Sequence, residues 1–177
     1  KGFGIPPGLG FIALSDKAWS SLSDRKRFYF DLETERKGQE KGRSAWTPAI
    51  TLIFGLEAAL SKFGEVGIDR VVQNHVELAE ATRAGAQAFG LELFAKSHPS
   101  DALTSIKVPD GIDGLKLLAT MRDRFGGVMA GGQNRLKGKI VRMAHLGFVN
   151  RFDVLKGMAA LEFALAEEGY GQPVGQG

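Results

Sequence analysis

Two long stretches near the middle of the chain carry apolar residues three or four positions apart, which places them on one face of a helix. These stretches are 48–63 and 68–89. The apolar positions of the first are Ile50, Ile53, Phe54, Leu56 and Leu60. Thr47 is a good N-cap with Pro48 in the first helical turn, and Gly90 is a typical C-terminal stop. The pattern therefore predicts two consecutive long helices.

After Gly90 the hydrophobic pattern becomes that of short strands. Residues 91–94 form a short apolar run, and 103–108 alternate apolar and polar side chains as a half-buried strand does. We also expect strands at 127–129 and at 139–145. In the last of these, Arg142 shares a face with two apolar neighbours.

Two further helices are expected among these strands. Asp113 can cap a helix that ends at Phe125, and Asn150 with Asp153 resembles the capping box of a final helix. The resulting order of elements predicts an α+β C-terminal part, with helices packed on one face of a small, mostly antiparallel sheet.

The N-terminal part shows a weaker pattern. Residues 8–14 form a continuous apolar run that is typical of a short, doubly buried strand, and 16–22 suggest a short helix. Residues 33–43 are charged, contain two glycines and lack apolar periodicity, so we expect a mobile loop or connector there.

Composition narrows the class of protein. The 177 residues are 44% hydrophobic and 24% charged, which is ordinary for a globular protein and argues against disorder. The net charge is +3, but the positive residues alternate with acidic ones and form no dense basic block. A nucleic-acid partner is therefore not expected.

Cysteine content and hydropathy bear on location. The chain has no cysteine, which excludes disulfides and thiolate metal sites and fits a reducing compartment. No apolar run approaches the roughly 20 residues of a membrane span, and no signal peptide is visible. We expect a cytoplasmic protein without a membrane partner. Because the chain opens on a lysine in mid-pattern, we also expect residues before Lys1 that are absent from this sequence.

Two features of the sequence suggest a phosphate loop and a metal site, but neither has the residue spacing that such a site requires. The glycine-rich segment 126–139 lacks the spacing of a phosphate loop and precedes a strand rather than a helix. His75, His98 and His145 have no metal-ligand spacing, so we interpret them as scattered structural residues and expect no metal site.

Arg142 is the most informative single residue. An arginine on an otherwise apolar strand must be paired or must point into a wet cleft, because an unpaired buried guanidinium is costly. Its planar fork suits bidentate capture of a carboxylate. The pattern alone leaves a structural salt bridge and a ligand clamp equally open.

The first eighteen residues carry the most specific motif, which reads Lys1-x-x-x-x-Pro6-Pro7-Gly8-Leu9, an apolar run, and Ser15-Asp16-Lys17-Ala18. A lysine at a chain end is in general only a solvated terminus. This motif, however, resembles the cofactor-lysine segment of class V aminotransferases, the alanine– and serine–glyoxylate aminotransferase group. The segments 44–60 and 139–147 resemble the same family, in the same order along the chain.

The resemblance implies a pyridoxal 5′-phosphate enzyme and assigns roles to four residues. Lys1 would hold the cofactor as a Schiff base and then act as general base, and Arg142 would bind the substrate α-carboxylate. Thr47 would reach the phosphate of the cofactor in the neighbouring subunit of a homodimer. Ser44 stands where some members have a phosphate-facing tyrosine, which leaves that second contact in question.

The implied fold is that of aspartate-aminotransferase-like enzymes, an α/β class of which this chain would be the C-terminal half. Residues 1–43 would end the large cofactor-binding domain, 44–90 would supply interface and linking helices, and 91–177 would form the small α+β domain. The expected reaction moves an amino group from alanine or serine to glyoxylate or pyruvate.

Other activities stay open. Lyases, racemase-like members and phosphonate transaminases share the family scaffold, and a non-catalytic α+β fragment is a further alternative. Desulfurases of the family need a cysteine on a loop of this half, which the chain lacks.

Overall fold

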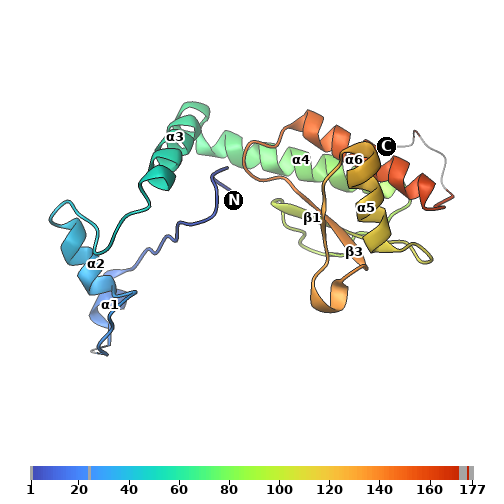
Figure 1. Ribbon diagram of the computed structural model, residues 1–177. Helices are drawn as coiled ribbons and strands as arrows, with labels where there is room; N and C mark the ends of the chain where they lie inside the picture. Colours follow the sequence, from blue (N-terminus) through green and yellow to red (C-terminus); the bar gives the residue numbers. More distant parts are fainter. Residues whose placement is uncertain (1, 24, 172–174, 176–177) are drawn as a thin grey trace. The chain divides into compact units, whose positions relative to one another are not determined.

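The computed structural model describes residues 2–23, 25–171 and 175 (Figure 1). The chain divides into two units, of which Ile5–Ala59 is one and the remaining described residues are the other. Helix α3 (Ile50–Val66) begins in the first unit and ends in the second. The domain boundaries expected near residues 43 and 90 stay a prediction.

Side-chain caps start the two short helices of the Ile5–Ala59 unit. Ser15 accepts a hydrogen bond of 3.3 Å from the Ala18 amide at the start of α1 (Asp16–Ser20). Asp31 accepts one of 2.7 Å from the Thr34 amide at the start of α2 (Leu32–Gln39). This bond lowers the pKa of the Asp31 carboxyl, because it stabilises the ionised form. Helix α1 agrees with the helix expected at 16–22.

The loop expected at 33–43 is wrong, because α2 occupies most of it. The helix has no apolar stripe, but Glu33 pairs with Lys37 at 3.5 Å and Arg36 with Glu40 at 3.3 Å, both one turn apart. Each such pair stabilises a helix by only a few tenths of a kcal/mol. The Arg36 guanidinium also lies 5.0 Å from the centre of the Trp19 ring, which joins α2 to α1.

The strand expected at 8–14 is also wrong, since this segment has no regular secondary structure. Phe11 and Ile12 are 60% and 69% exposed, so the apolar run is not buried. A strand needs a neighbour that satisfies its backbone groups, and no described strand pairs with this segment.

The second unit contains a three-stranded antiparallel sheet in the order β1-β3-β2. The strands are β1 (Leu103–Lys107), β2 (Ala130–Gly131) and β3 (Ile140–Ala144). Because β3 lies between the other two, its backbone is held from both sides. A short 3₁₀ helix, η1 (Asn134–Leu136), lies in the connection from β2 to β3.

Three helices complete this unit, namely α4 (Ile68–Ala88), α5 (Gly114–Phe125) and α6 (Arg151–Glu167). Helix α4 packs on β1, α5 packs on β2 and β3, and α6 packs on both helices (Figure 1). This arrangement confirms the predicted α+β part with an antiparallel sheet. No helix in the described part of the chain combines the length and the apolar character that crossing a membrane requires.

The core of the unit lies between the sheet and these helices. On β1 the buried residues are Thr104 and Ile106, and on β3 Val141 and Met143 point to the same side. The helices contribute the other large buried side chains, including Leu78, Leu117, Met121, Val154, Met158, Leu161 and Leu165.

Two of the expected strands differ from the structure. Residues 91–94 form only an isolated bridge, between Leu93 and Ile106, and the short strand expected at 127–129 lies instead at Ala130–Gly131. Both differences concern edge segments, where few ladder hydrogen bonds fix the ends of a strand.

The helix signals expected at Gly90, Asp113 and Asn150 are confirmed. Asn150 and Asp153 form a reciprocal capping box at the start of α6. Asp113 accepts hydrogen bonds from the first amides of α5, and Gly90 follows α4 with a positive φ of 75°.

Helix α5 approaches the turn before β3 closely at Gly114, and a substitution there tests this packing. A Cβ at Gly114 would overlap the carbonyl oxygen of Gly138, which is backbone and cannot rotate away. We expect Gly114→Ala to lower the free energy of unfolding by about 1–3 kcal/mol. Gly64→Ala is the matched control: it lies inside α3 with open space around it, and we expect a gain of up to about 1 kcal/mol. Urea unfolding of both variants measures the difference, and equal midpoints would contradict the close approach.

Candidate functional site

Arg142 lies at the centre of β3, where the register places Ser105 of β1 on one side and Ala130 of β2 on the other. Its neighbours Val141 and Met143 are buried, whereas Arg142 itself is half-buried. The Nε atom donates a hydrogen bond of 2.8 Å to the carbonyl oxygen of Gly131. This bond fixes the orientation of the guanidinium and leaves its two terminal nitrogens for another partner.

No carboxylate of the described residues lies within 4.0 Å of the Arg142 guanidinium. The structural salt bridge that the sequence left open is therefore not formed by the described chain. Arg142 instead lines a cavity of about 1100 Å³, together with the loop at 125–130 and the first turns of α6.

The charges in this cavity favour an anion. Lys156 adds a second positive charge, and the carboxylate of Asp153 is already bound to the Asn150 amide at 3.0 Å. Most of the other lining side chains are apolar, so a bound anion would be partly shielded from water. The cavity suits a small ligand that carries a carboxylate.

Ser44 and Thr47 lie in the other unit, on the segment that leads into α3. This segment is held by α2, because the Ala45 amide donates a hydrogen bond of 3.0 Å to the Glu35 carboxylate. The Trp46 ring also packs on Tyr29, with ring centres 4.6 Å apart. The hydroxyl of Ser44 donates to the carbonyl oxygen of Trp46, so it is already engaged locally.

Thr47 does not cap a helix, which corrects the expectation from the sequence. Helix α3 begins at Ile50, and the Ile50 amide donates to the carbonyl oxygen of Pro48 instead. Thr47 is exposed, and within the described chain its hydroxyl has no hydrogen-bond partner. The side chain is therefore free to bind an anion close to the start of α3.

The structure describes three of the four predicted site residues. Ser44 and Thr47 share one segment, and Arg142 belongs to the other unit. Lys1, the expected cofactor lysine, lies outside the described residues.

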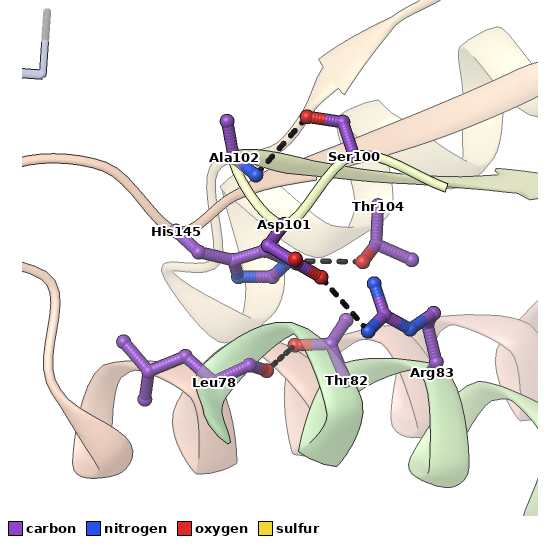
Figure 2. Close-up of polar contacts among 8 residues, drawn as sticks. All are labelled: Leu78, Thr82, Arg83, Ser100, Asp101, Ala102, Thr104 and His145. Carbon is purple, nitrogen blue, oxygen red and sulfur yellow. Dashed lines mark hydrogen bonds and ion pairs between the residues drawn. The ribbon is translucent and has the colours of Figure 1, made fainter. Parts of the chain in front are cut away.

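Sequence reasoning missed a buried polar cluster behind β3, which Figure 2 shows. His145 is completely buried, and its Nε2 lies 2.9 Å from the hydroxyl oxygen of Thr104. Arg83 of α4 pairs with Asp101 at 3.0 Å. A signal was present in the sequence, because His145 follows Val141 and Met143 at the spacing of the buried face of a strand.

Burial sets the charge state of His145. It lowers the pKa of the imidazole to about 4, and the nearby charges of Arg83 and His75 add to the effect while Asp101 opposes it. His145 is therefore neutral near pH 7. Its Nδ1 and the Nη1 of Arg83 are buried without a hydrogen-bond partner among the described residues.

Comparisons with known proteins identify the family. The chain is 41% identical over 173 residues to the soluble hydrogenase small subunit of Synechococcus sp., and 41% identical over 175 residues to an uncharacterized aminotransferase of Methanocaldococcus jannaschii. It is 35% identical over 186 residues to the serine–glyoxylate aminotransferase of Methylorubrum extorquens. These matches cover 96–100% of this chain but only 45–46% of the relatives. No protein-family model matches the chain.

Solved structures agree with these sequence matches. An aspartate aminotransferase from Thermus thermophilus has a TM-score of 0.84 and 33% identity over 95% of this chain. A pyridoxamine–pyruvate aminotransferase from Mesorhizobium loti has a TM-score of 0.87 and 28% identity over 99% of this chain. Each match covers 47% of the solved chain.

The fold of this chain and its structural neighbours are thus those of the aspartate-aminotransferase-like pyridoxal-phosphate enzymes. Within that class the chain belongs to the class V aminotransferases, as its first residues predicted. It spans about half the length of the relatives that it matches, which is consistent with a C-terminal half.

The buried His145 predicts a specific loss of stability in acid. The unfolded chain takes up a proton near pH 6.5 and the folded chain only near pH 4, so stability present above pH 6.5 is lost as the pH falls to 4. The expected loss is about 3 kcal/mol in the free energy of unfolding. The measurement is urea unfolding from pH 7.5 to 4 of the wild type and of His145→Gln, which cannot titrate. Parallel curves for the two proteins would show that His145 does not titrate in this way.

Proposed function

We propose that the protein to which this chain belongs is a pyridoxal-phosphate-dependent aminotransferase that moves an amino group from alanine or serine to glyoxylate or pyruvate. Arg142 is the observation that carries the proposal, since it lines a cavity and has no carboxylate partner in the described chain. Relatives named as serine–glyoxylate aminotransferases support this choice of substrates.

Arg142 binds the carboxylate that all these substrates share. The Gly131 carbonyl holds Nε and leaves the two terminal nitrogens as a fork, and Arg142 lines the cavity. A fork of this kind makes two parallel charge-assisted hydrogen bonds to a carboxylate and thereby sets its orientation as well as its affinity. Amino donor and oxo-acid acceptor both carry an α-carboxylate, so one arginine serves both halves of the reaction.

The residues present fit the cofactor at the positions that the structure describes. Thr47 offers a hydroxyl without a partner near the start of a long helix, where the free amides favour a phosphate. In a homodimer this threonine would serve the cofactor of the neighbouring subunit. Ser44 is a weaker candidate, because its hydroxyl already donates to Trp46.

In this proposal Lys1 would hold the cofactor through its side-chain amine. When bound, pyridoxal phosphate supplies the electron withdrawal that makes the substrate Cα–H acidic. The amine of Lys1 would act as the general base toward the Cα proton of the substrate. Arg142 meanwhile fixes the carboxylate, so that the Cα–H bond keeps one orientation toward that amine.

The remaining parts of the proposal concern organisation and location. Residues 1–43 belong to the end of the large domain, 44–90 to the interface and linking helices, and 91–177 to the small domain. The absence of cysteine supports a cytoplasmic location.

Arg142→Gln tests the carboxylate site. We expect KM for alanine and for glyoxylate to rise by about 30-fold to several hundred-fold, because a bidentate charged contact is lost. Lys156→Gln is the matched control: it removes a positive charge from the same cavity without removing the fork, and we expect a change below about threefold. Steady-state kinetics with both substrates measures these effects. Equal losses in the two variants would mean that only the general positive charge matters.

Lys1 is tested by its chemistry with the cofactor. The intact protein should show a visible absorption band from lysine-bound cofactor, borohydride should fix the cofactor to Lys1, and Lys1→Ala should abolish both. A protein without the band, or one fixed at another lysine, refutes the assignment of Lys1. A band that does not change with alanine or serine refutes these amino donors but leaves the fold unaffected.

A further inference from the structure

We propose that Thr104 and His145 form a positioning pair for Arg142, so that their buried hydrogen bond controls how tightly the protein binds a carboxylate. The inference rests on the proposed function of Arg142 and adds two residues that no resemblance or comparison assigns. Neither residue is among those that line the cavity, so neither is assigned a contact with the substrate.

The position of the pair follows from the register. Thr104 faces Met143 across the two strands, and the adjacent position, Ser105, faces Arg142. His145 follows β3 directly, and its amide donates a hydrogen bond of 3.0 Å to the carbonyl oxygen of Ala102. The 2.9 Å contact between the imidazole and the Thr104 hydroxyl therefore links β1 and β3 within three residues of Arg142.

This contact is the one side-chain hydrogen bond between β1 and the β3 segment among the residues that the structure describes. Thr104 is 3% exposed and His145 is not exposed at all, so water does not compete for the bond. A hydrogen bond in such surroundings is stronger and more rigid than one at the surface.

The pair is itself anchored to α4. Arg83 of α4 binds Asp101, two residues before β1 (Figure 2). The Thr82 hydroxyl of the same helix lies 3.8 Å from the sulfur of Met143. The hydroxyl of Thr82 also donates to the carbonyl oxygen of Leu78 in its own helix. Helix α4 thus contacts the segment that leads into β1 and the residue of β3 that follows Arg142.

Stability alone does not account for this cluster. His145 Nδ1 and Arg83 Nη1 are buried with no partner in the described chain, and each such atom costs about 1–3 kcal/mol. Apolar residues of similar shape would avoid that cost. A fully buried polar pair that is retained in spite of it is better explained by the fixed geometry that it gives to β3.

The test separates positioning from stability by means of the ligand. Ethylamine is alanine without its carboxylate, so a change confined to the carboxylate site alters binding of alanine and not of ethylamine. The variant is Thr104→Val, which keeps the shape of the side chain and removes the hydroxyl. The control is Thr120→Val, which removes a threonine hydroxyl bonded to Glu168 at 2.7 Å, a bond that involves neither β1 nor β3.

Spectral titration and steady-state kinetics of the intact cofactor-loaded protein supply the readouts. We expect Thr104→Val to raise KM and the dissociation constant for alanine about tenfold, with kcat changed less than about threefold and ethylamine binding unchanged. His145→Leu should reproduce these shifts. His145→Gln, whose side-chain amide can donate or accept a hydrogen bond near the position of Nε2, should restore alanine binding to within about threefold of the wild type.

Two outcomes would overturn the inference: equal weakening of alanine and ethylamine, or equal effects of Thr104→Val and Thr120→Val. Arg142→Gln separates this failure from failure of the proposed function. If Arg142→Gln changes the ratio of alanine to ethylamine binding and Thr104→Val does not, only the positioning role is wrong. If Arg142→Gln also leaves that ratio unchanged, the proposed role of Arg142 is wrong as well.

Discussion

A guanidinium held on a central strand without an acidic partner is the constraint on which this chain depends. The pairing of β3 with β1 and β2 fixes the backbone at Arg142, and the Gly131 carbonyl fixes the side chain. A half-buried positive charge is costly unless it is compensated, and the described residues leave the terminal nitrogens of Arg142 without a carboxylate. A ligand that carries an anion would supply the compensating charge, which is why we propose the cavity beside β3 as a substrate site.

Two different environments adjoin β3. Arg142 lines a cavity to which Lys156 adds a second positive charge. Apolar side chains form a core with α4, α5 and α6, and the buried Thr104–His145 pair joins β1 to the end of β3. A binding group on a strand that is backed by such a core moves little, and this rigidity is what precise binding of a carboxylate requires.

Much of this could be predicted from the sequence, where local rules dominate. Spacing and end signals predict the helix that stops before Gly90, the Asn150–Asp153 capping box and the strand around Arg142. The failures occur where distant contacts decide the structure. Residues 8–14 look like a buried strand, but no described strand pairs with them, and α2 forms from caps and ion pairs without an apolar stripe.

In the candidate site too, local patterns could be predicted from the sequence, whereas features that depend on distant contacts could not. Arg142 could be singled out because a charge on an apolar strand is unusual, but the choice between salt bridge and ligand clamp needed the positions of all nearby carboxylates. Thr47 looked like a helix cap because the composition around it fits one, and only the start of α3 at Ile50 shows that its hydroxyl is free. His145 was set aside because its partner, Thr104, lies 41 residues away in the chain.

The central claim is that Arg142 binds the substrate carboxylate, and a crystal structure of the intact protein with its cofactor and a small 2-oxo acid tests it most directly. The account predicts that both terminal nitrogens of Arg142 lie about 2.7–2.9 Å from the two carboxylate oxygens, with Nε still bound to the carbonyl oxygen of Gly131. A carboxylate bound elsewhere, with Arg142 paired to an acidic side chain of the protein, would contradict it.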